Sequence, residues 1–262
     1  MGFYREPKDV LKSKKGVLID IDGVLLNDGK PLNGGREFLE FLKDIGKPFI
    51  CITNTTIRSR KEIFYILKEY SFPVSENEIL TSTLIANYYL KKKYKTLPIC
   101  AYVNENVLED LFDLNLSDDG CTAVLLGDMG DGFSRRVLNE IFVKLMNGAD
   151  FYAFHKNRFW RVGNELFLDL GAFVSALEYA SGIKAKIIGK PSEIIFKESL
   201  SILGLSSEEV LIIGDDFESD ILGAKKLGID GILVLTGKYT EEILKRRNFS
   251  PEYLIKNLYE LL

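Results

Sequence analysis

The stretch Val17-Leu18-Ile19-Asp20-Ile21-Asp22-Gly23 decides the expected fold class of this 262-residue chain. The residues before Asp20 are apolar without alternation, which is typical of a strand that helices cover on both faces. A second run of this kind, residues 210–213, also leads into acids. Segments of helical periodicity lie between such runs; residues 59–70, for example, open with the capping pattern S-x-x-E. This alternation predicts parallel βαβ units and therefore an α/β fold with a doubly wound parallel sheet.

The middle of the chain contains enough strands and helices for a layer of its own. Strand-like runs occupy residues 98–103, 122–126, 151–154 and 159–162, and helix-like segments occupy residues 134–146 and 172–181. With boundaries near Thr81 and Lys186, we expect a discontinuous core formed by residues 1–81 and 187–262. Residues 82–186 are expected to form an inserted α/β cap domain.

The composition is that of an ordinary globular protein, with 46% hydrophobic and 27% charged residues and a formal net charge of −4. This charge gives no sign of the basic face that nucleic acids require. Residues 1–15 are polar and charged, and no apolar run reaches the ~18–20 residues that span a bilayer. We therefore expect a cytoplasmic protein with neither nucleic-acid nor membrane partners.

Cysteine and histidine usage excludes several kinds of site. Cys51, Cys100 and Cys121 show no metal-ligand spacing such as C-x-x-C, and we expect buried free thiols. His155 is the only histidine, so a Ser-His-Asp hydrolase or a His-rich zinc site would depend on it alone. A structural role, or a binding role at a cap surface, is the expectation for His155.

The acid pair Asp20 and Asp22 is the first candidate for chemistry. Carboxylates at positions i and i+2 of a strand project to the same side. Their mutual repulsion is costly unless a cation or a shared proton relieves it. Hard oxygen ligands suit Mg²⁺, and Gly23 permits a sharp turn directly after the pair. The alternative is a strand that simply ends in solvated acids.

Three further segments place polar groups after apolar runs. Thr53 and Asn54 follow a strand and can hydrogen-bond phosphoryl oxygens, although both residues also favour helix caps. Lys190 precedes a helix start marked by Pro191 and can neutralise developing phosphoryl charge. Residues 214–220 hold four acids: Asp215, Asp216, Glu218 and Asp220. The carboxyl ends of parallel strands converge on one crevice, so these segments are expected to meet there. Residues 220–227 are predicted to form the next helix, with Ile221, Leu222 and Ala224 turned inward.

The order acid pair, hydroxyl, lysine and acid cluster resembles the four motifs of the haloacid dehalogenase superfamily. The motifs are D-x-D-G-V from Asp20, Thr53-Asn54, Gly189-Lys190-Pro191 and G-D-D-x-x-x-D from Gly214. Residues 82–186, which lie between the second and third motifs, resemble the large α/β cap of the NagD-like subclass. Residues 125–140, 157–160 and 168–182 are similar to the branch that contains phospholysine phosphohistidine inorganic pyrophosphate phosphatase.

The resemblance implies a division of roles among these residues. Asp20 would attack phosphorus, and Asp22 would protonate the leaving oxygen and then activate water. Mg²⁺ would be held by the Asp20 carboxylate, the Asp22 backbone carbonyl and Asp215. The phosphoryl oxygens would be bound by Thr53, Asn54 and Lys190. Asp216 and Asp220 would surround these groups, and Asp220 would orient Lys190 or a metal-bound water.

The predicted function is hydrolysis of a small phosphorylated metabolite or pyrophosphate through an aspartyl-phosphate. Two alternatives remain open, namely a phosphotransferase or mutase with the same nucleophile, and a non-enzymatic aspartate phosphoacceptor. In the cap, His155 and Arg158 are candidates for substrate contact, and the loop 127–132 is expected to be a glycine-rich turn. By resemblance, the cap is expected to mediate a homodimer.

Overall fold

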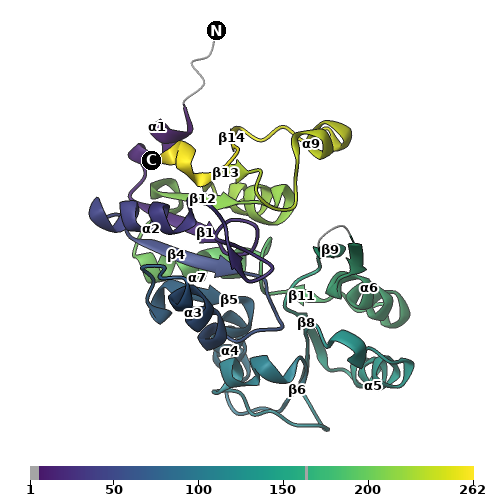
Figure 1. Ribbon diagram of the computed structural model, residues 1–262. Coiled ribbons are helices and arrows are strands. Elements are labelled where there is room, and N and C mark those ends of the chain that lie inside the picture. The colour runs from purple at the N-terminus through teal and green to yellow at the C-terminus, as the bar shows by residue number, and fades with distance from the viewer. Residues whose placement is uncertain (1–5, 163–164) are drawn as a thin grey trace. The chain divides into compact units, whose positions relative to one another are not determined.

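The computed structural model describes residues 6–162 and 165–262, and these form two compact units (Figure 1). The first unit comprises Met1–Thr53, Lys61–Leu80 and Lys190–Leu262, and the second comprises Asn54–Arg60 and Thr81–Gly189. Each unit has its own parallel sheet, as the expected α/β class requires. The assignment of the two units as a catalytic core and a cap stays a prediction.

The first unit is built on a six-stranded sheet with strand order β14-β13-β12-β1-β4-β5. The strands are β1 (Gly16–Asp20), β4 (Phe49–Thr53), β5 (Ile79–Thr81), β12 (Val210–Gly214), β13 (Asp230–Val234) and β14 (Tyr253–Ile255). The pairings from β14 across to β4 are all parallel. Every residue of β1, β4 and β12 is buried, which explains their unbroken apolar sequences.

Helices pack on this sheet through apolar stripes. The first unit contains α1 (Pro7–Ser13), α2 (Gly35–Asp44), α3 (Arg60–Glu69, except its first residue), α7 (Glu193–Leu203), α8 (Gly223–Lys225) and α9 (Glu241–Arg247). In α2, Phe38, Leu39 and Leu42 recur at helical spacing and are fully buried. Burial of such a side chain contributes about 1.5–3 kcal/mol. A short antiparallel hairpin, β2 (Leu26–Asn27) and β3 (Lys30–Pro31), follows the acid pair.

The second unit contains a four-stranded parallel sheet with order β11-β8-β7-β6. Its strands are β6 (Ile99–Tyr102), β7 (Ala123–Leu126), β8 (Asp150–Ala153) and β11 (Lys186–Ile187), and β9 (Phe159–Val162) pairs with β10 (Glu165–Leu168) in an antiparallel hairpin. Its helices are α4 (Ser82–Tyr94), α5 (Arg135–Met146) and α6 (Leu170–Ser181). Among the described residues, no helix has both the length and the apolar character needed to cross a membrane.

The cysteines differ from the expectation of three free thiols. Cys100 and Cys121 form a disulfide with a Cα–Cα distance of 5.5 Å, while Cys51 is free and buried. The prediction was wrong for two of the three because spacing along the chain does not show which cysteines meet in space. Cys121 lies two residues before β7, which pairs in parallel with β6, and so the chain returns beside Cys100 after 21 residues.

Asp110 organises the second unit close to two of the points where the chain passes between units. Its buried carboxylate accepts hydrogen bonds from the hydroxyls of Thr81 and Thr83 and from the backbone N–H of Arg60. Burial raises the pKa of this carboxyl despite those donors. One side chain thereby ties together residues from the two segments that make up this unit.

Candidate active site

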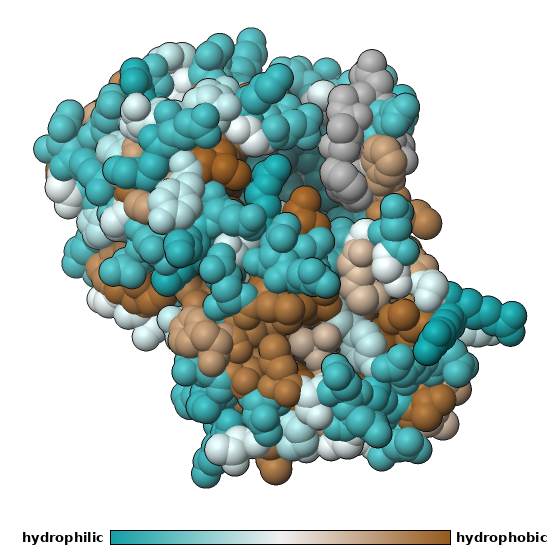
Figure 2. Space-filling model, turned by 60° about the horizontal axis from the view of Figure 1, so that its bottom comes forward, coloured by the Kyte–Doolittle hydropathy of each residue, from teal (hydrophilic) through white to brown (hydrophobic). Residues whose placement is uncertain are grey.

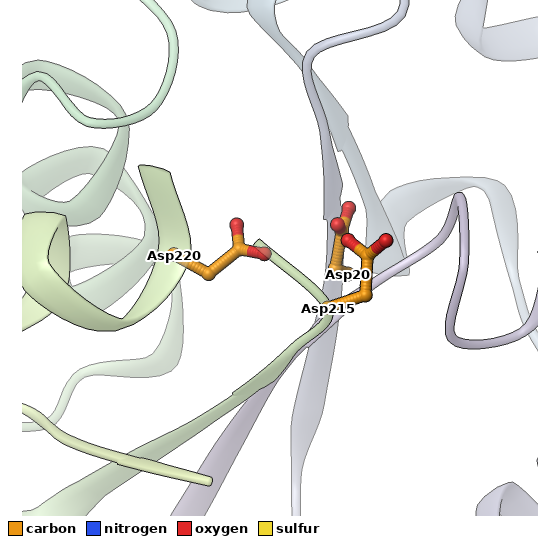
Figure 3. A group of neighbouring side chains, drawn as sticks. All are labelled: Asp20, Asp215 and Asp220. Atoms are coloured by element: carbon orange, nitrogen blue, oxygen red, sulfur yellow. The ribbon is translucent and has the colours of Figure 1, made fainter. Parts of the chain in front are cut away.

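Three buried carboxylates of the first unit lie together at the carboxyl end of its sheet (Figure 3). Asp20 is the last residue of β1, and Asp215 directly follows the neighbouring strand β12. Asp220 reaches the same place from the helical turn Phe217–Leu222, and oxygens of the three side chains lie within 4.8 Å of one another. The convergence of strand ends therefore brings these acids together, as the sequence predicted.

Lys190 lies between two of these acids. Its Nζ is 2.7 Å from Asp20 Oδ1 and 2.7 Å from Asp220 Oδ1, and the residue is only 2% exposed. Burial opposes the ammonium charge, but the carboxylates of Asp20 and Asp220 outweigh it and raise the lysine's pKa. Lys190 therefore remains charged and holds Asp20 in a fixed orientation.

Burial and the negative charge of their neighbours disfavour the ionised forms of these three acids. Burial raises the pKa of Asp20, and the positive charge of Lys190 offsets only part of this increase. Burial and the charges of Asp20 and Asp220 raise the pKa of Asp215 well above its usual range. Burial also raises the pKa of Asp220, to about 7. Like charges this close favour either protonation or a cation between them, and a carboxylate set of this kind suits a hard divalent cation.

The second acid of the pair differs from the first in its environment. Asp22 is exposed, whereas Asp20 is 5% exposed, because the strand ends at Asp20 and the chain turns at Gly23, whose φ is +81°. The hydroxyl of Thr53, at the end of β4, donates a hydrogen bond to Asp22 Oδ2 over 3.0 Å. Asp22 is therefore in contact with solvent, whereas Asp20 is shielded from it.

Asn54 begins the second unit, in which its Oδ1 lies against Gly189. A Cβ on Gly189 would approach Asn54 Oδ1 to 2.4 Å, so the close packing there requires glycine. A role for Asn54 in phosphoryl binding stays a prediction.

Asp216 acts as a cap for the turn Phe217–Leu222. It accepts hydrogen bonds from the backbone N–H groups of Glu218 and Ser219, and its Oδ2 lies 2.5 Å from the Nζ of Lys238. Burial works against its charge, but Lys238 and these donors lower its pKa. Its own backbone N–H donates to Asp220 Oδ2 over 3.0 Å, which links the cap to the acid cluster.

Sequence reasoning did not identify the residues that follow β13. The backbone N–H of Lys238 donates to Asp215 Oδ2 over 2.6 Å, and the Thr236 hydroxyl donates to the Gly23 carbonyl oxygen over 2.6 Å. The signal was present, because Thr236-Gly237-Lys238 is a polar, glycine-containing segment directly after an apolar strand run.

The candidates in the second unit show mainly structural contacts. His155 is 4% exposed, and its Nε2 lies 3.8 Å from Asp169 Oδ1; whether its role is structural or in binding stays a prediction. Arg158 and Lys156 line a cavity of about 480 Å³ beside Gly171, Ala172 and Ser175. In the loop 127–132, Asp128 Oδ1 accepts a hydrogen bond from the Gly130 N–H, as turns with Asp and Gly commonly do.

The first unit thus defines a class of protein: a parallel α/β enzyme with carboxylates and a lysine at its strand ends. Family models support this class. One described as "Haloacid dehalogenase-like hydrolase" matches residues 17–117, and one described as "HAD-hyrolase-like" matches residues 187–261.

Relatives extend the match over nearly the whole chain. The human haloacid dehalogenase-like hydrolase domain-containing protein 2 is 36% identical over 243 residues, covering 93% of this chain and 92% of the relative. The phospholysine phosphohistidine inorganic pyrophosphate phosphatase of Rattus norvegicus is 32% identical, covering 87% of this chain and 86% of the relative. The chain therefore belongs to the haloacid dehalogenase-like hydrolase family, as its four motifs predicted.

Solved structures share the fold. The p-nitrophenyl phosphatase from Archaeoglobus fulgidus matches with a TM-score of 0.89 and 28% identity, covering 95% of this chain and 98% of that one. NagD from Escherichia coli K-12 matches with a TM-score of 0.83 and 24% identity, covering 94% and 97%. These matches confirm the fold class and the NagD-like resemblance.

Proposed function

We propose that the protein is a Mg²⁺-dependent phosphatase that hydrolyses a small phosphorylated compound through an aspartyl-phosphate on Asp20. The observation that carries the proposal is the buried Asp20 carboxylate at the end of β1, fixed by Lys190 over 2.7 Å and adjacent to Asp215. The names of the rat and Archaeoglobus relatives, both phosphatases, support the reaction type.

The proposed reaction uses two carboxylates with different environments. An Asp20 oxygen attacks phosphorus, a bond from Asp20 to phosphorus forms, and the bond to the leaving oxygen breaks. Asp22, which is exposed and bonded to Thr53, donates a proton to the leaving oxygen. Asp22 then takes a proton from water as that water attacks the aspartyl-phosphate and releases phosphate.

Positive charge around the phosphoryl group comes from two sources. Lys190 neutralises negative charge at the oxygens nearest Asp20. A divalent cation, when bound by Asp20, Asp215 and the Asp22 backbone carbonyl, supplies further charge stabilisation to the transferred group. Asp220 also pairs with the Lys190 ammonium over 2.7 Å, which helps to hold that group beside Asp20.

The proposal includes an association between two copies through residues 82–186. Phe112 and Met146 of the second unit are 61% and 58% exposed, and hydrophobic side chains reach the surface at several places on the face drawn in Figure 2. Light scattering coupled to size-exclusion chromatography tests this part, and a monomer at all concentrations contradicts it. We also propose a cytoplasmic location, because no apolar run of the sequence reaches the ~18–20 residues that span a bilayer.

The decisive experiment measures phosphate release from p-nitrophenyl phosphate, pyrophosphate and a panel of phosphoesters, with Mg²⁺ or with EDTA. Wild type should release phosphate only with Mg²⁺, and Asp20→Asn should reduce release to background. Asp9→Asn, which changes an exposed acid of α1, is the matched control and should retain full activity.

Two results would contradict the proposal. Activity of Asp20→Asn equal to wild type would remove Asp20 as the nucleophile. Transfer of phosphate to an added alcohol without release of free phosphate would identify a phosphotransferase instead.

A further inference from the structure

The turn Thr236-Gly237-Lys238, here called the 236–238 turn, touches two separate parts of the acid site. Its first residue donates a hydrogen bond from the Thr236 hydroxyl to the carbonyl oxygen of Gly23, next to Asp22. Its last residue donates from the Lys238 backbone N–H to Asp215 Oδ2. The two hydrogen bonds are both 2.6 Å long, and they join the loop after β1 to the residue after β12.

The Asp215 carboxylate is enclosed by two glycines from these loops. A Cβ added to Gly237 would lie 2.0 Å from Asp215 Oδ2 and 2.8 Å from Asp215 Cβ. A Cβ added to Gly23 would lie 2.2 Å from the same oxygen. Rotation of the carboxylate alone cannot relieve the first contact, because the Cβ of Asp215 is also too close. The close packing of Gly23 and Gly237 therefore restricts the positions that the Asp215 carboxylate can occupy.

Lys238 makes a second contact with the same acidic segment. Its Nζ lies 2.5 Å from Asp216 Oδ2, and Asp216 in turn caps the turn that carries Asp220. The 236–238 turn therefore contacts the residues on both sides of the peptide bond between Asp215 and Asp216. The backbone N–H of Lys238 bonds to Asp215 and its side chain pairs with Asp216. The turn therefore restrains the orientation of the backbone at Asp215, directly after β12.

We propose that the 236–238 turn is a positioning element for the divalent cation, with Thr236 and Gly237 as positioning residues that set the Asp22 carbonyl and the Asp215 carboxylate. This inference rests on the proposed function, because it assumes that these groups are metal ligands. Groups that hydrogen-bond to metal ligands orient them, and their loss weakens metal affinity by roughly 10–100-fold. In this turn the Lys238 N–H makes such a bond to Asp215 directly, whereas Thr236 acts on the Asp22 carbonyl one residue removed, through the carbonyl of Gly23.

The test measures Mg²⁺ binding by isothermal titration calorimetry without substrate, alongside the Mg²⁺ dependence and the KM of phosphate release. Thr236→Val keeps the shape of the side chain but removes its hydroxyl, and Thr236→Ser retains the hydroxyl. Gly237→Ala places a methyl group against Asp215. Thermal unfolding without Mg²⁺ establishes that each variant is folded.

We expect Gly237→Ala to raise the Kd for Mg²⁺ by roughly 10–100-fold, because its methyl group displaces the Asp215 carboxylate directly. Thr236→Val, which acts through the Gly23 carbonyl, should raise the Kd by an amount at the lower end of that range, about 10-fold. KM at saturating Mg²⁺ should change little, and Thr236→Ser should bind Mg²⁺ like wild type. If Gly237→Ala fails to fold, the comparison of Thr236→Val with Thr236→Ser still decides the matter.

Three outcomes overturn the inference, and they differ in what else they overturn. Mg²⁺ binding by wild type that is unchanged in both folded variants, or equally weakened by Thr236→Val and Thr236→Ser, removes only the positioning role. A wild-type protein that binds no Mg²⁺ removes the proposed function and this inference together.

Discussion

The Lys190 ammonium offsets much of the negative charge of the acid cluster, because it pairs with Asp20 and Asp220 where little solvent is present. Breaking a buried ion pair from one side leaves an uncompensated charge, which costs about 3–5 kcal/mol. The carboxylates can escape that cost by taking up protons, and a protonated Asp20 is a poor nucleophile.

We therefore expect Lys190→Met to abolish phosphate release and to lower the free energy of unfolding, by up to about 3–5 kcal/mol at neutral pH. Urea denaturation followed by circular dichroism measures the stability. Lys184→Met is the control, since the Lys184 side chain is 82% exposed and its loss should change neither quantity by much. Retained activity in Lys190→Met would show that the lysine is not required at the phosphoryl group.

At the scale of single residues, the sequence correctly predicted that acidic side chains at the strand ends lie close together. Asp20, Asp215, Asp220 and Lys190 were predicted to meet, and they do. The sequence could not show that Asp22 is exposed while Asp20 is buried, because this depends on where β1 ends and the chain turns. It also did not reveal that Lys238 contributes a backbone N–H, a group that every residue except proline possesses.

At the scale of elements, the acidic segment after β12 shows why helix predictions fail locally. A helix was predicted over residues 220–227 with Ile221, Leu222 and Ala224 inward, but the chain forms a π-helical turn over Phe217–Leu222 before α8. The N–H of Ile221 reaches back to the carbonyl of Asp216, five residues earlier. This wider turn shifts the periodicity, and Leu222 is 38% exposed while Ile221 and Ala224 are buried.

The disulfide between Cys100 of β6 and Cys121, two residues before β7, has a testable effect on stability. Closing a loop of this length restricts the unfolded chain and contributes about 3 kcal/mol in the chain-entropy account. We expect reduction with a phosphine, or the Cys121→Ser substitution, to lower the thermal midpoint of the second unit. Cys51→Ala should respond to the reductant as wild type does, because Cys51 is a free thiol in the first unit. An unchanged midpoint on reduction would contradict a stabilising role.

At the scale of the whole molecule, the chain contains two compact units. The first should respond to Mg²⁺, and the second to reduction of its disulfide. We expect Mg²⁺ to slow amide hydrogen exchange around residues 214–220 and 236–238, because a bound cation stabilises the state that holds it. Reduction of the disulfide should speed exchange in residues 99–126. Hydrogen exchange read by mass spectrometry follows both regions at once. If each treatment altered both units equally, the units would not be energetically separate.

The position of β1 within its sheet has a consequence for synthesis on the ribosome. β1 pairs with β4, which follows soon after it, and with β12, which begins about 190 residues after β1 ends. At roughly 5–20 residues per second, the nascent chain spends about 10–40 s with one edge of β1 unpaired. The intervening residues can meanwhile complete the second unit. The order of the segments therefore delays completion of the first unit's sheet until β12 has left the ribosome, after the whole second unit has been made.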